Sequence, residues 1–361
     1  MTPVTPGREE TLFGNKVGKD DFDYLRVVGE GAHAKVMQVR EKKTGKMLAM
    51  KVLNKRKVID MGQVDNIMIE RRVLEQINNP FFVNLHHAFQ TRDKLYLLLD
   101  FCNGGELFYH MKNEVRFSIS RVRLYVAEIA CGLDHMHSMG IIYRDLKPEN
   151  LLIDLQGHIR FADFGMCKRA LMGDLGTARE RAVSVCGTPE YMAPEVIQGN
   201  GKQEYSKGVD WWALGTLLYE MLAGRPPFYN GDRGVMFQRI LHAPIPSNQY
   251  VPPAAFDLIS KLLERNPRTR LGSGQKDFKT IMAHPFFAPL DWDAVRDRRT
   301  APEFVPLATS DYVDPCFSSE PVRPHARKSQ VSPSWDESNF QGFSYNATTA
   351  TPISAGPPGK N

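Results

Sequence analysis

The sequence predicts an α+β chain: a small antiparallel β-rich N-terminal lobe followed by a larger helical lobe. Short apolar or alternating segments fill residues 22–101, as is typical of strands. From Leu107 onward, longer segments carry apolar residues three and four positions apart, as helices do. Apolar residues make up 42% of the 361 residues, which is enough for a sizeable core.

The predicted strands of the first lobe lie in three segments, FDYLRVVGEG, AKVMQVREKKTGKMLAMKVL and KLYLLLDF. KKTGK, inside the second segment, predicts a hairpin turn. DNIMIERRVLEQI has helical spacing and predicts the helix of this lobe. Residues 1–10 are polar and lack the apolar stretch of a signal peptide. We expect residues 1–21 to be a flexible lead-in.

In the second lobe, one helix is expected to run from Ser120 as N-cap to Gly140 as C-cap, and another to end at Gly224. After about Phe287 the composition shifts toward proline, serine and isolated aromatic residues. The expected organisation is a domain over 22–287 with lobes 22–101 and 102–287, a tail over 288–346 and a disordered end over 347–361.

Composition excludes several classes of protein. No apolar run reaches the roughly 18 residues of a membrane span. The five cysteines form no Cys-x-x-Cys pair, so neither a zinc site nor a disulfide framework is indicated. The net charge of +5 is mild. We therefore expect a monomer without nucleic-acid partner or membrane anchor, in the cytoplasm with the nucleus as a second compartment.

A glycine-containing segment could bind phosphates. Glycines let a hairpin tip lie close to phosphates and offer its N–H groups to them, but a plain hairpin explains the same residues, and Ala34 stands where a third glycine is expected. A dinucleotide site is excluded because a strand follows the segment instead of a helix. The residues of the glycine-containing segment are Gly29, Glu30, Gly31, Ala32, His33, Ala34, Lys35 and Val36.

Lys51 lies between apolar residues on a predicted strand and needs a partner, for which Glu70 on the following helix is the candidate. The two could form a structural ion pair. They could also hold an ammonium group against the α- and β-phosphates of a nucleotide.

The segment YRDLKPENLLID, followed by ADFG, carries the strongest chemical pattern. Asp145 is placed to accept the proton of a substrate hydroxyl, and Lys147 to neutralise a transferring phosphoryl group. Asn150 and Asp163 offer the hard oxygen ligands that Mg²⁺ prefers. With APE following at Ala193–Glu195, the pattern predicts phosphoryl transfer from Mg·ATP.

Over roughly Phe22 to Phe287 these motifs resemble the eukaryotic protein kinases. The resemblance implies the bilobal kinase fold, with ATP held between the lobes. It implies a linker, Asp100-Phe101-Cys102, that binds adenine through its backbone. Further residues take positions by resemblance alone: Leu99 as gatekeeper; Val36, Ala49 and Leu152 around adenine; Glu106 and Glu149 in the ATP site; Leu74, Leu85, Tyr143 and Phe164 in the regulatory spine; Asp210 bracing the catalytic loop; and Glu195 paired with Arg270.

Other motifs resemble the AGC serine/threonine kinases, with protein kinase B and the serum- and glucocorticoid-regulated kinases as nearest relatives. They are DLKPEN, Tyr143 in place of the usual histidine, CGTPEYMAPE, VDWWALG and NFQGFSY. The 20 or so residues before the kinase segment leave no room for a lipid-binding domain. We expect a signalling kinase that is activated by phosphorylation.

The resemblance places Glu106, Glu149 and Glu220 where carboxylates select arginines upstream of the target, and Thr188 in the same substrate-binding set. Guanidinium–carboxylate pairing is strong, so we expect Arg-x-Arg-x-x-Ser/Thr-like substrates with an apolar residue after the target. Glu106 could also cap the helix starting near Leu107, and both functions are compatible.

Ser184 aligns with the activation-loop phosphosite, where a phosphate could pair with Arg144 and Lys168. Arg179 and Arg181 lie five and three residues before it, in the pattern expected of substrates. This suggests autophosphorylation in trans, although the arginines could simply solvate the loop.

The tail carries further switches by resemblance. Ser344 matches the hydrophobic-motif phosphosite. Phe340 and Phe343 are expected to dock between the Glu70 helix and the strand holding Leu95, with Gln90 and Arg92 as phosphate partners. An upstream activating kinase is expected to dock on this motif. Ser332, with Ser329 as rival, is the expected turn-motif site.

Three alternatives remain open in the sequence. Cys167 and Cys186 could form a regulatory disulfide or remain buried thiols. A pseudokinase scaffold is disfavoured because the catalytic set is complete. A lipid or small-molecule kinase is disfavoured by the acidic substrate positions.

Overall fold

This computed structural model describes residues 17–31, 34–169, 188–199, 206–273, 277–307 and 337–347. The chain divides into two units. The N-terminal unit comprises Met1–Glu75, Asn84–Phe101 and Ser318–Asn361, and the C-terminal unit comprises Gln76–Val83 and Cys102–Phe317. Ser184, Ser329, Ser332, Ala32, His33 and Cys186 lie outside the described residues.

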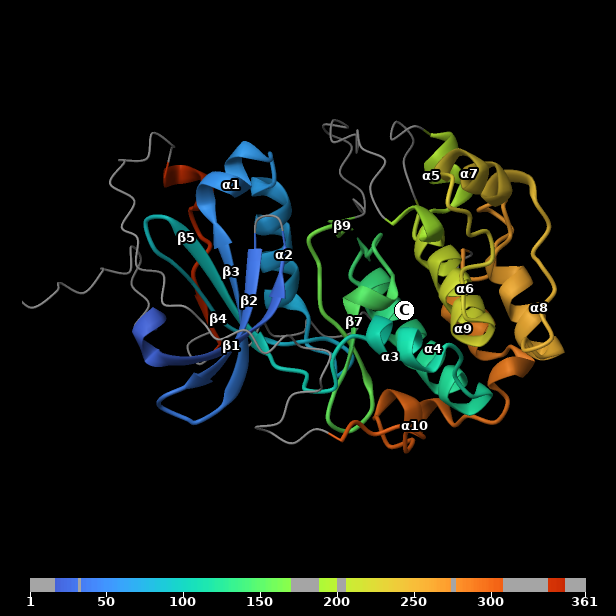
Figure 1. Cartoon of the computed structure of the whole chain (residues 1–361), viewed down its shortest axis with the longest axis horizontal. Helices are drawn as coiled ribbons and strands as arrows, with labels where there is room; N and C mark the ends of the chain where they lie inside the picture. Colours follow the sequence, from blue (N-terminus) through green and yellow to red (C-terminus); the bar gives the residue numbers. More distant parts are fainter. Residues whose placement is uncertain are drawn as a thin grey trace, which may run out of the picture. The chain divides into compact units, whose positions relative to one another are not determined.

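The N-terminal unit is built on an antiparallel sheet with strand order β1-β2-β3-β5-β4-β10. The last strand comes from the tail and lies along β4 (Figure 1). The strands are β1 (Phe22–Glu30), β2 (Ala34–Glu41), β3 (Met47–Asn54), β4 (Leu85–Gln90), β5 (Lys94–Asp100) and β10 (Tyr345–Asn346).

The two faces of this sheet differ because side chains alternate along each strand. Leu48 and Met50 of β3 belong to the buried apolar core on one face. Ala49 and Lys51 point to the other face, where they lie opposite Leu99 of β5 and Val36 of β2 in the strand register. The register thus gathers four of the residues expected around ATP on one face.

The helices α1 (Lys55–Asp60) and α2 (Val64–Gln76) follow β3. The sequence predicted α2 from its apolar spacing, and its buried side chains include Ile67 and Leu74. The predicted KKTGK hairpin is also confirmed: Glu41 donates its N–H to the Lys46 carbonyl at 2.9 Å.

The C-terminal unit is mainly helical, with two small strand pairs, β6 (Ile141–Ile142) with β9 (Lys168–Arg169) and β7 (Leu151–Ile153) with β8 (Ile159–Phe161). Helix α6 is apolar on nearly all sides and forms the core. The helices are α3 (Leu107–Glu114), α4 (Ile119–Ser138), α5 (Pro194–Gln198), α6 (Gly208–Ala223), α7 (Arg233–His242), α8 (Pro253–Leu262), α9 (Asp277–Met282) and α10 (Trp292–Arg296).

Helix ends correct two expectations. The N-cap of α4 is Ser118, whose hydroxyl accepts the Arg121 N–H at 3.2 Å, so the expected cap at Ser120 is wrong. Glu106 occupies the N-cap position of α3, but its side chain makes no capping hydrogen bond. The side chain of an N-cap residue accepts the backbone N–H two or three residues after it, so the position of the N-cap depends on where the chain turns into the helix. The presence of two nearby serines does not tell which of them is the N-cap. The end of α6 at Gly224, with φ of 87°, is as predicted.

No helix in the described part of the chain combines the length and the apolar character needed to span a membrane.

Candidate active site

A buried aspartate fixes the loop that carries the candidate catalytic residues. Asp210 of α6 accepts the N–H groups of Tyr143 at 3.0 Å and Arg144 at 2.8 Å. The His137 ring nitrogen lies 2.7 Å from the same carboxylate. Arg144 has a φ of 68°, a conformation that a non-glycine residue holds only when its surroundings impose it. Asp210 therefore imposes the loop backbone, as the resemblance implied.

The loop places three of the predicted catalytic side chains in contact. Lys147 Nζ lies 2.9 Å from Asp145 Oδ2, and Asn150 donates its amide N–H to the Asp145 carboxylate and carbonyl, both at 2.8 Å. The pKa of Asp145 is raised, because its carboxylate is buried. The charge of Lys147 and the hydrogen bonds from Lys147 and Asn150 offset part of this rise. The Asp145 carboxylate is thus held in one orientation. The amide oxygen of Asn150 takes no part in these bonds and can serve as a ligand for a cation.

Asp163 follows β8 in the same unit. It accepts the Gly165 N–H at 3.0 Å, and the preceding Ala162 donates its N–H to the Asn150 carbonyl at 3.0 Å. This backbone bond ties the Asp163 segment to Asn150. No cluster of three or more histidine, cysteine, aspartate or glutamate side chains suited to a metal occurs among the described residues.

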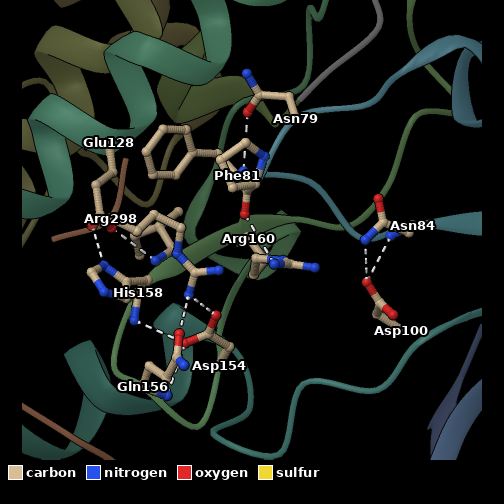
Figure 2. Close-up of polar contacts among 12 residues, drawn as sticks. Asn79, Phe81, Asn84, Asp100, Glu128, Asp154, Gln156, His158, Arg160 and Arg298 are labelled. Atoms are coloured by element: carbon tan, nitrogen blue, oxygen red, sulfur yellow. Dashed lines mark hydrogen bonds and ion pairs between the residues drawn. The ribbon is translucent and has the colours of Figure 1, made fainter. Parts of the chain in front are cut away.

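The turn between β7 and β8 is held by a buried network that the sequence did not reveal (Figure 2). Glu128 of α4, fully buried, accepts the Ile159 N–H at 2.9 Å and pairs with the His158 ring. Arg298 donates to Asp154 at the start of the turn. The network fixes the strands between Asn150 and Asp163, but its contacts join residues 30 to 144 positions apart, so no local motif indicates it.

In the N-terminal unit, the predicted ion pair between Lys51 and Glu70 is present, with Nζ 2.6 Å from Oε1. Glu70 is fully buried on α2. In the glycine segment, Gly31 donates its N–H to the carbonyl of Ala34, the first residue of β2, at 2.8 Å. Glu30 is exposed and pairs with Lys35 at 3.7 Å.

The three glutamates expected to select arginines are electrostatically coupled in the C-terminal unit. Burial, and secondarily the charge of Glu149, raises the pKa of Glu106. Burial raises the pKa of Glu220 to about 7, although the Tyr191 hydroxyl donates to it. One oxygen of Glu149 is buried and makes no hydrogen bond to any described residue. Such a carboxylate is costly unless a cationic partner arrives.

Two other predicted features lie in the same unit. Arg270 forms a bidentate pair with Glu195, at 2.7 and 2.8 Å. Thr188 is half-buried, and its carbonyl accepts the Tyr191 N–H at 3.0 Å. Cys167 is buried, and Cys186, the expected second cysteine of this alternative, lies outside the described residues.

The tail docks in the N-terminal unit. Phe340 and Phe343 are fully buried, and the tail strand β10, which follows them, pairs with β4. Gln90 is buried and donates to the Phe340 carbonyl at 3.1 Å while accepting from Lys55 at 2.7 Å. Its amide therefore binds the tail backbone and Lys55 at once.

Arg71, which the sequence did not single out, binds the tail backbone directly. It donates to the carbonyls of Phe343 at 3.1 Å and Ser344 at 3.2 Å. Arg71 is the residue after Glu70 on α2. Arginines are common on helices, so the sequence held no signal for this contact.

Comparisons with known proteins agree with the geometry. The protein kinase domain family matches residues 22–287. The RAC family serine/threonine-protein kinase homolog of Dictyostelium discoideum is 45% identical over 346 residues, which is 94% of this chain and 75% of that protein. Human serine/threonine-protein kinase Sgk2 is 44% identical over 335 residues, 90% of this chain and 88% of that protein. Aspergillus fumigatus serine/threonine protein kinase ypkA is 46% identical over 337 residues, 92% of this chain and 51% of that protein.

A family match over most of the chain, together with relatives of this identity, confirms the resemblance drawn from the motifs. The chain belongs to the protein kinase family, as a serine/threonine protein kinase of the AGC type related to the SGK, RAC and YPK kinases.

Proposed function

We propose that this kinase phosphorylates serine and threonine residues that follow arginines in an Arg-x-Arg-x-x-Ser/Thr-like pattern. The observation that carries the proposal is the cluster of Glu106, Glu149 and Glu220, with its buried, unpaired carboxylate oxygen. Guanidinium groups fit such a cluster because they bring charge and several N–H donors at once.

In this proposal Asp145 accepts the proton of the substrate hydroxyl, and Lys147 neutralises charge on the transferring phosphoryl group. The fixed contacts among Asp145, Lys147 and Asn150 support these assignments. Asn150 and Asp163 would hold Mg²⁺, which supplies neutralisation of phosphate charge when bound. Their oxygen donors suit a hard cation.

ATP binding is assigned to residues of both units. In the N-terminal unit, Lys51, braced by Glu70, would bind phosphates, and the backbone N–H groups of the segment 29–36 would cover them. Val36, Ala49 and Leu99 would contact adenine from their shared sheet face, with Asp100 at the linker. In the C-terminal unit the assigned residues are Cys102, Glu106, Glu149 and Leu152.

Peptide phosphorylation tests the selectivity. A peptide with both arginines should be phosphorylated with kcat/KM at least about tenfold above peptides in which either arginine is alanine, because each loses a charge-assisted pair. In the Glu220→Gln variant, the ratio of kcat/KM between the two-arginine peptide and the peptide lacking one particular arginine should decrease. The corresponding ratio for the other arginine should stay unchanged. The Asp145→Asn protein provides the background. Equal rates for all peptides would disprove the proposed selectivity.

The raised pKa of Glu220 predicts a pH dependence. Below pH 7 this group is mostly protonated and neutral, and above pH 7 it is a carboxylate that attracts guanidinium. For the two-arginine peptide, kcat/KM should therefore rise between pH 6 and pH 8, by roughly threefold to tenfold. The rise should be absent with Glu220→Gln. A rise of the same size in that variant would assign the titration to another group.

We further propose that tail docking activates the kinase through α2. Phe340 and Phe343 are buried, and Arg71 joins the tail carbonyls to the helix that carries Glu70. Ordering this helix would hold Glu70 against Lys51. Phosphorylation of Ser344, and binding of an upstream kinase to the same motif, would act on this equilibrium.

Phe343→Ala should accordingly lower kcat about tenfold, because the docked tail loses a fully buried aromatic side chain. KM for ATP should change by a smaller factor than kcat. Steady-state kinetics at saturating peptide measures both constants. Tyr229→Ala, which removes an aromatic ring that is 50% exposed in the C-terminal unit, is the control for loss of an aromatic side chain. Unchanged turnover in Phe343→Ala would refute activation by the tail.

Two phosphorylation proposals rest on sequence alone. Ser184 is proposed as a site of autophosphorylation in trans, because Arg179 and Arg181 precede it in the proposed substrate pattern. Catalytically inactive Asp145→Asn protein, incubated with active enzyme, should gain phosphate at Ser184. Modification by an upstream kinase only would refute this. Ser332 is proposed as the turn-motif site.

A further inference from the structure

His86 occupies an irregular position in the sheet of the N-terminal unit. In the β4–β5 register Leu85 lies opposite Leu99, while His87 lies opposite Leu98. Two steps along β4 therefore match one step along β5, and His86 is the extra residue. A bulge of this kind turns a side chain away from the direction that regular pairing would give it.

The His86 side chain reaches the first residue of the linker. Its Nε2 lies 2.7 Å from Asp100 Oδ1, and Lys46 Nζ lies 3.2 Å from the same nitrogen. Lys46 Nζ also lies 3.6 Å from Asp100 Oδ1. Asp100 Oδ2 accepts the Asn84 side-chain amide at 2.7 Å and its backbone N–H at 3.1 Å (Figure 2).

Asp100 is thus fixed at the point where β5 ends and the linker begins. Its side chain is 17% exposed, and its own backbone N–H is bonded to the Asn84 carbonyl at 3.0 Å. Asp100 is held through both its side chain and its backbone. A displacement of the groups that bind it should therefore move the linker that follows, because packed groups move between discrete arrangements.

The backbone of His86 is bound by the tail. Its carbonyl accepts the N–H of Ala347, directly after β10, at 3.0 Å. The adjoining register pairs Tyr345 with Ala88 and Asn346 with His87. One residue therefore contacts the tail through its carbonyl and the linker through its ring.

We propose that His86 is a positioning residue that couples docking of the tail strand β10 to the adenine-binding linker, so that the docked tail raises the affinity for ATP. The inference rests on the proposed function, in which the linker binds adenine. It adds a second contact to the route through α2: His86 binds the tail at Ala347, whereas Arg71 binds the Phe343 and Ser344 carbonyls and lies over the Tyr345 ring. When β10 undocks, the His86 carbonyl loses its hydrogen bond from the Ala347 N–H. Strand β4 can then relax toward regular pairing with β5, which turns the His86 ring away from Asp100.

Four single variants of the whole chain test the coupling. His86→Ala removes the ring, and His86→Gln keeps a side-chain N–H donor. Ala347→Pro removes the N–H that binds the His86 carbonyl, whereas Ala347→Gly keeps it and serves as the matched control. Ala347 is exposed, so the pair does not disturb a core. Thermal unfolding of each variant identifies any general loss of structure.

The primary measurement is the dissociation constant for ATP by calorimetry, with KM for ATP and kcat alongside. His86→Ala should weaken ATP binding about fivefold and Ala347→Pro about threefold, with a smaller change in kcat. His86→Gln should recover most of the loss, and Ala347→Gly should match the parent. The double variant His86→Ala with Ala347→Pro should be no worse than His86→Ala alone, because both changes break one route.

Coupling is reciprocal, so ATP should also favour tail docking by the same factor. Hydrogen exchange at the amide of Ala347 should slow when ATP is added to the parent, and should not respond in His86→Ala. Independent, multiplying effects of the two variants on ATP binding would overturn the proposal, as would unchanged ATP affinity in both. Neither calorimetry nor exchange requires phosphoryl transfer, so a failure of the proposed peptide selectivity would leave these results interpretable.

Discussion

Asp210→Asn should lower kcat by at least about 100-fold, because a misplacement of about 1 Å in a catalytic loop is enough for such a loss. One carboxylate oxygen of Asp210 accepts from the Tyr143 N–H and faces the His137 ring, and the other accepts from the Arg144 N–H. In Asp210→Asn, one of these two oxygens is replaced by an NH₂ group. In either orientation of the amide, that NH₂ group faces the N–H donor of Tyr143 or Arg144 in a buried site. The loop loses its fixed backbone, and Asp145 its orientation.

Two variants separate this effect from others. Asp145→Asn should lower kcat by about 1,000-fold through loss of the proton acceptor, with little change in stability. Asp210→Asn should lower both activity and the unfolding temperature, since a buried donor without an acceptor costs about 1–3 kcal/mol.

Asp232→Asn is the matched control for the same chemical change. Asp232 caps α7 by accepting the Val235 N–H at 2.9 Å, and asparagine caps a helix equally well. An Asp210→Asn enzyme as active as the Asp232→Asn enzyme would contradict the bracing function.

Arg270→Met should destabilise the C-terminal unit by about 3–5 kcal/mol, because it leaves a partly buried carboxylate without its counter-charge. Arg270 is almost fully buried and makes the bidentate pair with Glu195. It also donates to the carbonyls of Gly208 and Glu264, both at 2.8 Å. Methionine keeps much of the volume and none of these bonds.

Tryptophan fluorescence during thermal unfolding can follow this change, since Trp211, Trp212 and Trp292 all lie in the C-terminal unit. The unfolding temperature should fall by roughly 10 °C. The double variant Arg270→Met with Glu195→Met should recover part of the loss, because it removes the unpaired charge.

Arg299→Met is the control, since its ion pair with Asp297 is about 60% exposed on both sides (59% and 63%) and exposed pairs contribute little. Equal shifts for Arg270→Met and Arg299→Met would show that the buried pair does not stabilise the unit.

The sequence predicted the parts of the site whose residues lie close together in the chain. Asp145, Lys147 and Asn150 share one short loop, so their residue types and spacing reveal both their proximity and their chemistry. The Lys51–Glu70 pair was predictable for a related reason: an inward-facing lysine on a strand needs a carboxylate, and the helix predicted for this unit, α2, offers one. Helix α6 and its end at Gly224 follow from apolar content and a glycine.

Other contacts depend on where the chain folds back. His137 and Arg71 are ordinary helical residues and His158 is a turn residue, and their long-range partners lie between 30 and 273 positions away. The tail provides the clearest example. Its aromatic motif predicted docking, but not the strand β10, whose pairing with β4 is set by which edge of the sheet is open.

The sequence by itself determined that this protein is a serine/threonine kinase of the AGC type, because its reactive groups must follow one another at short, fixed spacings to act together. Tertiary structure alone decided that β10 pairs with β4 and that the bulge at His86 touches both the tail and Asp100. Strand order and register are set by long-range pairing and by the burial of one sheet face, neither of which leaves a local pattern in the chain.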